Sequence, residues 1–314
     1  MSPDDALVAL GRSLREEGYR FNTVTPETHE RIWNRHPAAL ARDARDVFGW
    51  NRWFLPAVLS PRLFAHLEAS GELDRSGALC RSRVRAATFR DLTILHSSFP
   101  TAQADSVFFG PDTYRFTRIL DWARQEPSQL GVDVGCGSGA AGLLLSRTCQ
   151  QVILSDINPQ ALRLAGINAR INGIHNCRTV LSDCLAAIPA QADLIVANPP
   201  YLVDAAQRTY RHGGGSLGTG LAVRILTQAL ERLPASGRVG IYTGVPIVAG
   251  EDRFWREIQP HLGAPGLTTS YEELDPDVFS EELDAPAYAE TERLAVVALT
   301  VRMPAEMARP TSAT

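Results

Sequence analysis

The fold of this chain is decided by residues 132–139, which read Val132-Asp133-Val134-Gly135-Cys136-Gly137-Ser138-Gly139. They end a short apolar run that predicts a buried strand, and the glycines let the backbone turn sharply into a helix. The start of such a helix offers free N–H groups to a carboxylate or a phosphate. The dinucleotide fingerprint G-x-G-x-x-G is not matched, because Ala140 stands where its last glycine would be. By itself the loop predicts a ligand-binding site at the end of this strand, but it does not determine the chemical class of the ligand.

Outward from this loop, short apolar strands alternate with helical segments. The expected strands are Leu130–Val134, Gln151–Ser155, Arg178–Ser182, Asp193–Ala197, Arg238–Thr243 and Leu294–Val301. Helices are expected over Pro159–Ile171, with Asn158 as N-cap, and over Thr219–Leu233. This alternation predicts an α/β fold, in which helices cover both faces of a mostly parallel sheet.

Two aspartates stand at the ends of successive strands. Asp156 is followed by Ile157, and one strand later Asp183 precedes Cys184. A carboxylate at the first position can accept two hydrogen bonds from a ribose diol, and one at the second can accept from an adenine amino group. Either aspartate alone could be a helix cap. Together with the glycine loop they predict a pocket for an adenosine-containing ligand at the carboxyl ends of the strands.

The most specific motif is Asn198-Pro199-Pro200-Tyr201, directly after the fourth strand of this series. Two successive prolines fix the backbone and remove two N–H donors. The Asn198 side-chain oxygen and the Pro199 carbonyl can accept the two N–H bonds of a planar substrate, and Tyr201 can stack on it. We expect these three residues to be catalytic. The alternative, a proline-rich turn with an Asx cap, does not predict the coincidence with the glycine loop and the aspartates.

With these motifs, residues 130 to about 245 resemble the class I S-adenosylmethionine-dependent methyltransferases, whose sheet is Rossmann-like and seven-stranded. The chain is similar to the protein-glutamine N5-methyltransferases of release factors and to the small-domain rRNA guanine-N2 methyltransferases. Phe109–Tyr114 resembles the proline–acid–threonine segment of the glutamine enzymes, and Gly213–Leu221 their glycine-rich stretch. The resemblance implies S-adenosyl-L-methionine as cofactor, bound by Thr113, Asp133, Gly135, Gly137, Gly139, Asp156, Ile157, Asp183, Cys184 and Asn198.

Residues 1–100 do not resemble the small helical domain of the release-factor enzymes. Helices are expected over 6–17, 26–33, 38–48 and 61–69, followed by a hairpin of strands 79–86 and 92–98. Helices followed by a hairpin resemble a winged-helix module. We therefore expect a substrate or partner domain over 1–100, a methyltransferase domain over 101–302 and a loose tail over 303–314.

Three arginines alternate along the first strand of that hairpin. Alternation would put Arg81, Arg83 and Arg85 on one face of the strand. Such a face could contact phosphate or an acidic partner. We favour the simpler interpretation, which is a solvated strand face.

Composition excludes several classes of function. All 31 basic residues are arginines, which excludes a catalytic lysine, and the net charge of -4 argues against a protein built to coat nucleic acid. The five cysteines form no C-x-x-C pair, so we expect neither disulfides nor a metal site. The chain has no apolar run long enough to span a bilayer, and its first residues lack a basic signal-peptide region. A cytoplasmic protein without membrane contact is expected.

The predicted function is methyl transfer to a planar amide or amino nitrogen of a protein or a small molecule. Two alternatives stay open: methylation of a base amino group in rRNA or DNA, and a non-catalytic regulator that binds S-adenosylmethionine. The intact Asn198–Tyr201 motif argues against the regulator. A nicotinamide-dependent enzyme is disfavoured by the glycine spacing.

Overall fold

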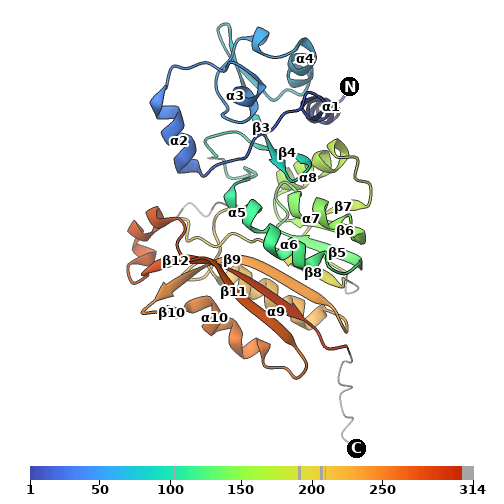
Figure 1. Ribbon diagram of the computed structural model, residues 1–314, viewed down its shortest axis with the longest axis vertical. Coiled ribbons are helices and arrows are strands. Elements are labelled where there is room, and N and C mark those ends of the chain that lie inside the picture. Colours follow the sequence, from blue (N-terminus) through green and yellow to red (C-terminus); the bar gives the residue numbers. More distant parts are fainter. Residues whose placement is uncertain (102, 190–191, 206–207, 209, 306–314) are drawn as a thin grey trace, which may run out of the picture.

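The computed structural model describes residues 1–101, 103–189, 192–205, 208 and 210–305. Its centre is a sheet with the strand order β11-β12-β9-β8-β5-β6-β7, to which β10 adds a short pairing on β9 (Figure 1). The strands are β5 (Ser128–Val134), β6 (Cys149–Asp156), β7 (Cys177–Leu181), β8 (Leu194–Ala197), β9 (Arg238–Val248), β10 (Glu251–Asp252), β11 (Thr268–Asp275) and β12 (Arg293–Arg302). Strands β5 to β9 run parallel, and β12 is antiparallel to both β9 and β11.

The sheet confirms the α/β prediction and the six expected strands, with bounds shifted by a few residues. Strand β11 is not among the expected strands, because its sequence is acidic and has no apolar run. It lies at the edge of the sheet, and its residues are exposed or only half-buried. An edge strand needs no continuous apolar run, since only one of its sides meets another strand.

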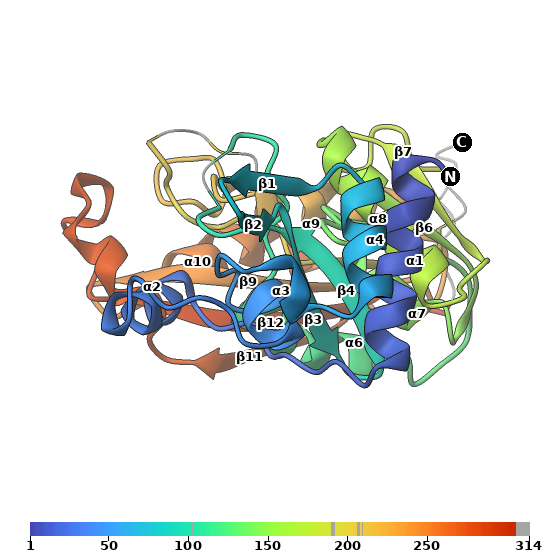
Figure 2. The same cartoon turned by 90° about the horizontal axis from the view of Figure 1, so that it is seen from above.

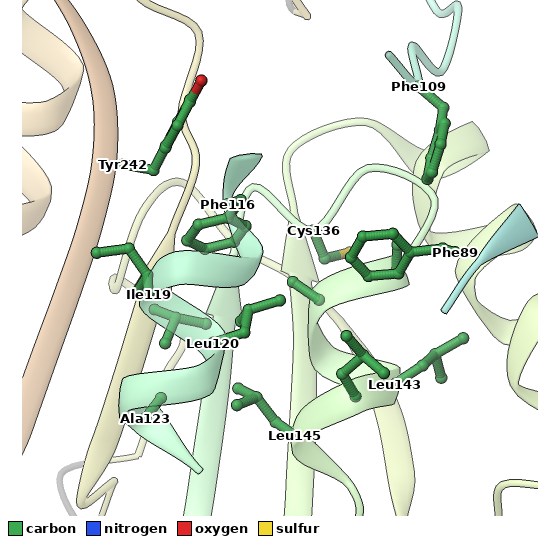
Figure 3. Packing of buried hydrophobic residues seen from close by; sticks show 14 of the residues in the cluster. Phe89, Phe109, Phe116, Ile119, Leu120, Ala123, Cys136, Leu143, Leu145 and Tyr242 are labelled. Carbon is green, nitrogen blue, oxygen red and sulfur yellow. The ribbon is translucent and has the colours of Figure 1, made fainter. Parts of the chain in front are cut away.

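Helices cover both faces of the sheet. They are α5 (Pro111–Arg115), α6 (Thr117–Ala123), α7 (Ala140–Leu145), α8 (Pro159–Ile171), α9 (Gly220–Arg232) and α10 (Arg253–Ile258), with short 3-10 turns η2 (Gln259–Leu262), η3 (Ser280–Asp284) and η4 (Pro286–Tyr288). On one face α6 and α7 bury Phe116, Leu120, Leu143 and Leu145 in a common core (Figure 3). On the other face α9 and α10 bury a second apolar cluster. Helix α8 matches its prediction, and the Asn158 side chain accepts from the Gln160 N–H at 2.9 Å, as a helix cap does.

The N-terminal region lies above the sheet in Figure 1 and contains four helices and two hairpins. Its elements are α1 (Pro3–Glu16), α2 (Pro26–Arg35), α3 (Ala44–Phe48), η1 (Pro56–Val58), α4 (Pro61–Ala69), β1 (Leu73–Ser76), β2 (Leu79–Ser82), β3 (Val84–Phe89) and β4 (Leu92–Ser97). The four predicted helices are present. The third is shorter than predicted, because the Asp43 carboxylate caps it by accepting from the Asp46 N–H at 2.8 Å.

The prediction of one hairpin is wrong. The expected strand 79–86 is two strands, since β2 pairs with β1 and β3 pairs with β4 in separate two-stranded sheets. The break falls at Arg83. Beside it the Ser82 hydroxyl accepts from the Val84 N–H at 3.2 Å and donates to the Val84 carbonyl at 2.6 Å. These local bonds hold a bend where a straight ladder was expected. The likeness to a winged helix stays a prediction.

Because the strand is broken, the three arginines do not share a face. Arg81 donates to the Asn51 carbonyl at 3.1 Å, and its guanidinium lies 4.9 Å from the ring centre of Trp33. Arg83 pairs with Asp74 at 2.6 Å. Arg85 is 4% exposed and donates to the Gly49 carbonyl. Both interpretations of an arginine face were therefore wrong, since two of the three guanidiniums stabilise the N-terminal region from within.

Helix α8 connects the two parts of the chain. Asn168 accepts from the Leu95 N–H at 2.8 Å and donates to the Leu95 carbonyl at 2.9 Å. Asn172 makes the same pair of bonds with Thr93. The two amides therefore satisfy the free edge of β4, and Asn168 also donates to Ser138 in the glycine loop. Helix α1 packs against both α4 and α8, and it lies between these two helices in Figure 1.

The end of the chain departs from the predicted loose tail at its first residues. Met303 is buried and donates its N–H to Gly237, and the Pro304 carbonyl accepts from Ser236. Residues 306–314 of this predicted tail lie outside the described residues. Across the part of the chain that the structure describes, no helix is long and apolar enough to cross a membrane.

Candidate cofactor and acceptor site

A cavity of about 760 Å³ lies at the carboxyl ends of the parallel strands. It forms because β5, β6, β7 and β8 are in register, so that the segments following them meet at one edge of the sheet. Of the predicted site residues, the cavity is lined by Thr113, Asp133, Gly135, Gly137, Asp156, Ile157, Asp183, Cys184, Asn198, Pro199 and Tyr201. Gly139 stands behind this lining, where a Cβ atom would lie 2.9 Å from the Ala165 Cβ, so it allows α7 to pack against α8.

A buried carboxylate, Asp133, and a half-buried one, Asp156, hold the glycine loop and the start of α7. Asp133 accepts from the Gly142 N–H at 2.8 Å, and burial raises the pKa of its carboxyl to about 7. Asp156 accepts from the N–H groups of Gly137 and Asn158, each at 2.9 Å, and burial raises its pKa as well. Asp156 therefore fixes the loop and presents its carboxylate edge to the cavity.

The next two strand ends supply apolar and polar surface for an aromatic base. The Ile157 side chain is 55% exposed beside Asp156, which is unusual for an isoleucine. Asp183 also lines the cavity and pairs with Arg224 of α9, whose guanidinium contacts the Cys184 sulfur at 2.8 Å. An exposed aliphatic side chain and two carboxylates in one cavity fit a nucleoside. The ribose hydroxyls could bond to Asp156, and the base could pack on Ile157.

The Asn198–Tyr201 motif also lines the cavity. Asn198 is half-buried there, and neither its side chain nor the Pro199 carbonyl bonds to any described residue. The Asn198 side-chain oxygen and the Pro199 carbonyl can therefore each accept a hydrogen bond from a bound molecule. Two acceptors therefore stand available at the cavity wall.

Tyr201 is held by a network that sequence reasoning missed. Its hydroxyl donates to Asp112 at 2.6 Å, and Tyr242 of β9 donates to the other oxygen of Asp112 at 2.8 Å. Arg115 lies 3.3 Å from Asp112. Burial raises the pKa of Tyr201 well above its ordinary value, so the phenol stays a donor. Its ring packs edge-on to Phe279 at 6.0 Å and fills the space beside Gly244. The predicted stacking of this ring on a substrate stays a prediction.

The glycine-rich stretch after the motif folds tightly onto it. Gly213 donates to the Leu202 carbonyl at 2.9 Å. A Cβ atom on Gly218 would lie 2.1 Å from the Tyr201 carbonyl oxygen, at a φ of +86°. Only glycine fits such an approach without displacing backbone. The glycine-rich stretch therefore holds the backbone of Tyr201 and Leu202 in place. Next to it lies His212, whose Nδ1 accepts a hydrogen bond from the Asp204 N–H.

The outer part of the cavity is built by segments for which no motif was recognised. Phe108 and Tyr210 stack with ring centres 6.1 Å apart. Phe99 comes from the N-terminal region and stacks on His29 of α2. The cavity is also lined by Pro26, Glu27, Glu30, Arg208, Arg211 and Glu281. Only the tertiary fold brings these residues together, since no fixed spacing along the chain relates them.

The comparisons with known proteins agree with this geometry. Residues 117–243 match the family model described as methyltransferase small domain. A release factor glutamine methyltransferase of Lactococcus lactis subsp. lactis is 31% identical over 149 residues, which covers 43% of this chain and 54% of that protein. One from Chlamydia trachomatis serovar L2 is 44% identical over 72 residues, which covers 22% and 24%. The chain thus spans about half of the first relative's length and about a quarter of the second's.

A solved structure shares the fold over more of the chain. WT Trm5b from Pyrococcus abyssi superposes with a TM-score of 0.50 at 17% identity, covering 74% of this chain and 62% of that one. The sheet order and the cavity at its carboxyl edge define a class I methyltransferase fold. Residues 117–243, which include the glycine loop, Asp156, Asp183 and Asn198, are therefore similar to the methyltransferase small domain.

Proposed function

We propose that the protein transfers a methyl group to a planar amide or amino nitrogen, with Asn198, Pro199 and Tyr201 holding that nitrogen. The observation that carries the proposal is the pair of free acceptors at Asn198 and Pro199, in the same cavity as the glycine loop and Asp156. S-adenosylmethionine supplies an activated methyl group on its sulfonium sulfur. The matched relatives named release factor glutamine methyltransferases support an amide acceptor.

The residues of this chain contribute by positioning. The Asn198 side-chain oxygen and the Pro199 carbonyl accept the two N–H bonds of the acceptor and aim its electron pair at one point. Both oxygens also favour the positive charge that develops on nitrogen during transfer. Correct orientation alone can lower the barrier by several kcal/mol, on the order of 7–11 at best. Asp156, Ile157 and Asp183 bind the nucleoside, and Thr113, Gly135, Gly137 and Cys184 complete that side of the cavity.

The N-terminal region, which we place at about residues 1–100, forms the outer wall of the acceptor side. It contributes Glu27, Glu30 and Phe99 to the cavity. We therefore propose that it takes part in selecting the acceptor, while residues 101–302 hold the cofactor.

Asn198→Ala tests the proposal. Because the Asn198 amide bonds to no described residue, its loss leaves the fold intact. We expect methyl transfer from a tritiated donor into the protein fraction of a cell extract to fall at least about a hundredfold, the effect of removing one transition-state acceptor. The affinity for S-adenosylhomocysteine, measured by calorimetry, is expected to change less than about threefold. A variant that transfers methyl at the wild-type rate contradicts the role of Asn198, and label in the RNA fraction alone favours a nucleobase acceptor.

A further inference from the structure

The glycine loop takes part of its support from the N-terminal region. Its residue Ser138 stands between Gly137 and Gly139, whose φ angles are +52° and +81°. With a glycine on each side, this backbone has little restraint of its own, so bonds from outside the loop decide where it rests. Since Ser138 lines the cavity, a contact that fixes its backbone also fixes part of the proposed cofactor site.

One side-chain amide connects Ser138 to strand β4. Asn168 of α8 is fully buried, and its Nδ2 donates to the Ser138 carbonyl and to the Leu95 carbonyl, each at 2.9 Å. Its Oδ1 accepts from the Leu95 N–H at 2.8 Å. The planar amide is thus held at three points, with both of its N–H groups in use. A shift of β4 along α8 would therefore move the donor that holds Ser138.

A second connection reaches the neighbouring loop residue, Gly137. Asp105 lies in the segment that follows β4, and its carbonyl accepts from the Asn158 side chain at 2.8 Å. The Asn158 N–H donates to Asp156, whose other oxygen accepts from the Gly137 N–H, both at 2.9 Å. Asn158 caps the start of α8 and Asn168 lies further along the same helix. Helix α8 therefore carries both connections between the N-terminal region and the glycine loop.

Asn172, one turn further along α8, shows what Asn168 does beyond holding β4. Its side chain accepts from the Thr93 N–H at 3.1 Å and donates to the Thr93 carbonyl at 2.9 Å. It also donates to the Asn168 carbonyl of its own helix, and among the described residues it makes no bond to the glycine loop. Satisfying the free edge of β4 therefore accounts for Asn172, but it does not account for the bond from Asn168 to Ser138.

We propose that Asn168 is a positioning residue of the cofactor site, through which the docked hairpin β3–β4 sets the affinity for the cofactor. The inference rests on the proposed function, since it concerns the binding of S-adenosylmethionine. Asn168 does not line the cavity, so it acts on the cofactor through Ser138. Strand β4, α1 and α8 pack against one another, and Figure 2 shows β4 beside α1. Because coupling between two sites is reciprocal, the bound cofactor is expected to hold β4 more firmly at Leu95.

Calorimetric titration of the full chain with S-adenosylhomocysteine tests the role of Asn168. Asn168→Ala removes the bond to Ser138, and we expect it to weaken binding about three- to tenfold, the range for one net hydrogen bond. Asn172→Ala is the matched control, because it removes an equivalent pair of bonds to β4 but none to the loop. We expect the control to change the affinity less than about twofold. Wild-type affinity in N168A, or equal losses in both variants, overturns the inference.

Hydrogen exchange in the wild-type protein tests the same coupling even if a variant fails to fold. The Leu95 and Thr93 N–H groups both bond to asparagines of α8, but only the asparagine that holds Leu95 also holds the glycine loop. Saturation with S-adenosylhomocysteine is expected to slow exchange at Leu95 about three- to tenfold more than at Thr93. Equal slowing at both amides overturns the inference, since a ligand that stabilises the whole fold protects both alike. A wild type that does not bind S-adenosylhomocysteine refutes the proposed cofactor, whereas normal binding without these differences refutes only the role of Asn168.

Discussion

Asp112 joins the acceptor motif to the sheet, and removing its carboxylate tests this connection. In Asp112→Ala the hydroxyls of Tyr201 and Tyr242 lose their acceptor, and these residues are only 6% and 0% exposed. Each stranded buried hydroxyl costs about 1–3 kcal/mol, so we expect the free energy of unfolding to fall by about 2–6 kcal/mol. The Arg115 guanidinium keeps a partner, because it also pairs with Asp275 at 3.0 Å.

A double-mutant cycle isolates the bond between Asp112 and Tyr201. Tyr201→Phe alone is expected to cost about 1–3 kcal/mol, since it removes a hydrogen bond to a carboxylate. In the Asp112→Ala background the same substitution removes only a stranded hydroxyl, so it costs less than about 0.5 kcal/mol or stabilises. Urea unfolding with a constant slope provides the free energies.

Tyr271 provides the matched control for this cycle. Its hydroxyl donates to Asp252 at 2.6 Å, the same distance as in the Tyr201–Asp112 pair, but to a different aspartate. Tyr271→Phe is therefore expected to cost a similar amount and to be additive with Asp112→Ala. If Tyr201→Phe is also additive, the network does not hold the motif, and the reasoning about Asp112 is refuted.

Three further predictions concern the loop, the buried carboxylate and the base pocket. Gly218→Ala should lower the free energy of unfolding, measured with urea, by about 1–3 kcal/mol more than Gly214→Ala does. Both glycines have positive φ, but only at Gly218 would a Cβ atom lie 2.1 Å from a carbonyl oxygen. Equal losses in the two variants would contradict this close approach. Folding raises the pKa of Asp133 to about 7, so its ionised form is disfavoured in the folded state and stability falls as pH rises from about 4 to about 7, with a slope of at most about 1.4 kcal/mol per pH unit. Asp133→Asn retains the acceptor for Gly142 and should flatten that slope, and an unchanged slope assigns the titration to another group. Asp183→Ala should weaken S-adenosylhomocysteine about tenfold in calorimetry while leaving an analogue without the adenine amino group unaffected, and equal losses for both ligands would remove Asp183 from base recognition.

Local sequence was sufficient for the elements that need no distant partner. Asn158 and Pro159 start α8 through a cap and a fixed φ, both of which depend on neighbouring residues alone. Strands β8 and β9 are buried along their whole length, and β5 and β6 along most of theirs, so their apolar runs predict them directly. Since parallel strands end at one edge, the order of glycines, Asp156, Asp183 and Asn198 along the chain already predicts that they meet.

Sequence failed where long-range contacts compete with local pattern. Alternation at Arg81, Arg83 and Arg85 predicts one strand face, yet the chain bends at Ser82, and Arg85 enters the interior to bond the Gly49 carbonyl. Strand β11 is acidic and exposed, and it exists because β12 offers it an edge. Neither the burial of Arg85 nor the presence of strand β11 can be predicted from a short window of neighbouring residues.

The sequence by itself determined the class of fold and predicted which residues line the proposed cofactor side of the cavity, because backbone turns and strand-end carboxylates depend on neighbouring residues. Only the tertiary structure decided the acceptor side. Glu30 and Glu281 both line the cavity although most of the chain separates them. Tyr201 is oriented by Asp112, and the four strands β5 to β8 lie between these two residues in the sequence. The physical reason is that the function of a charged group or a hydroxyl depends on the groups packed against it. That packing is determined by the arrangement of the whole sheet, and the spacing of residues along the sequence does not reveal it.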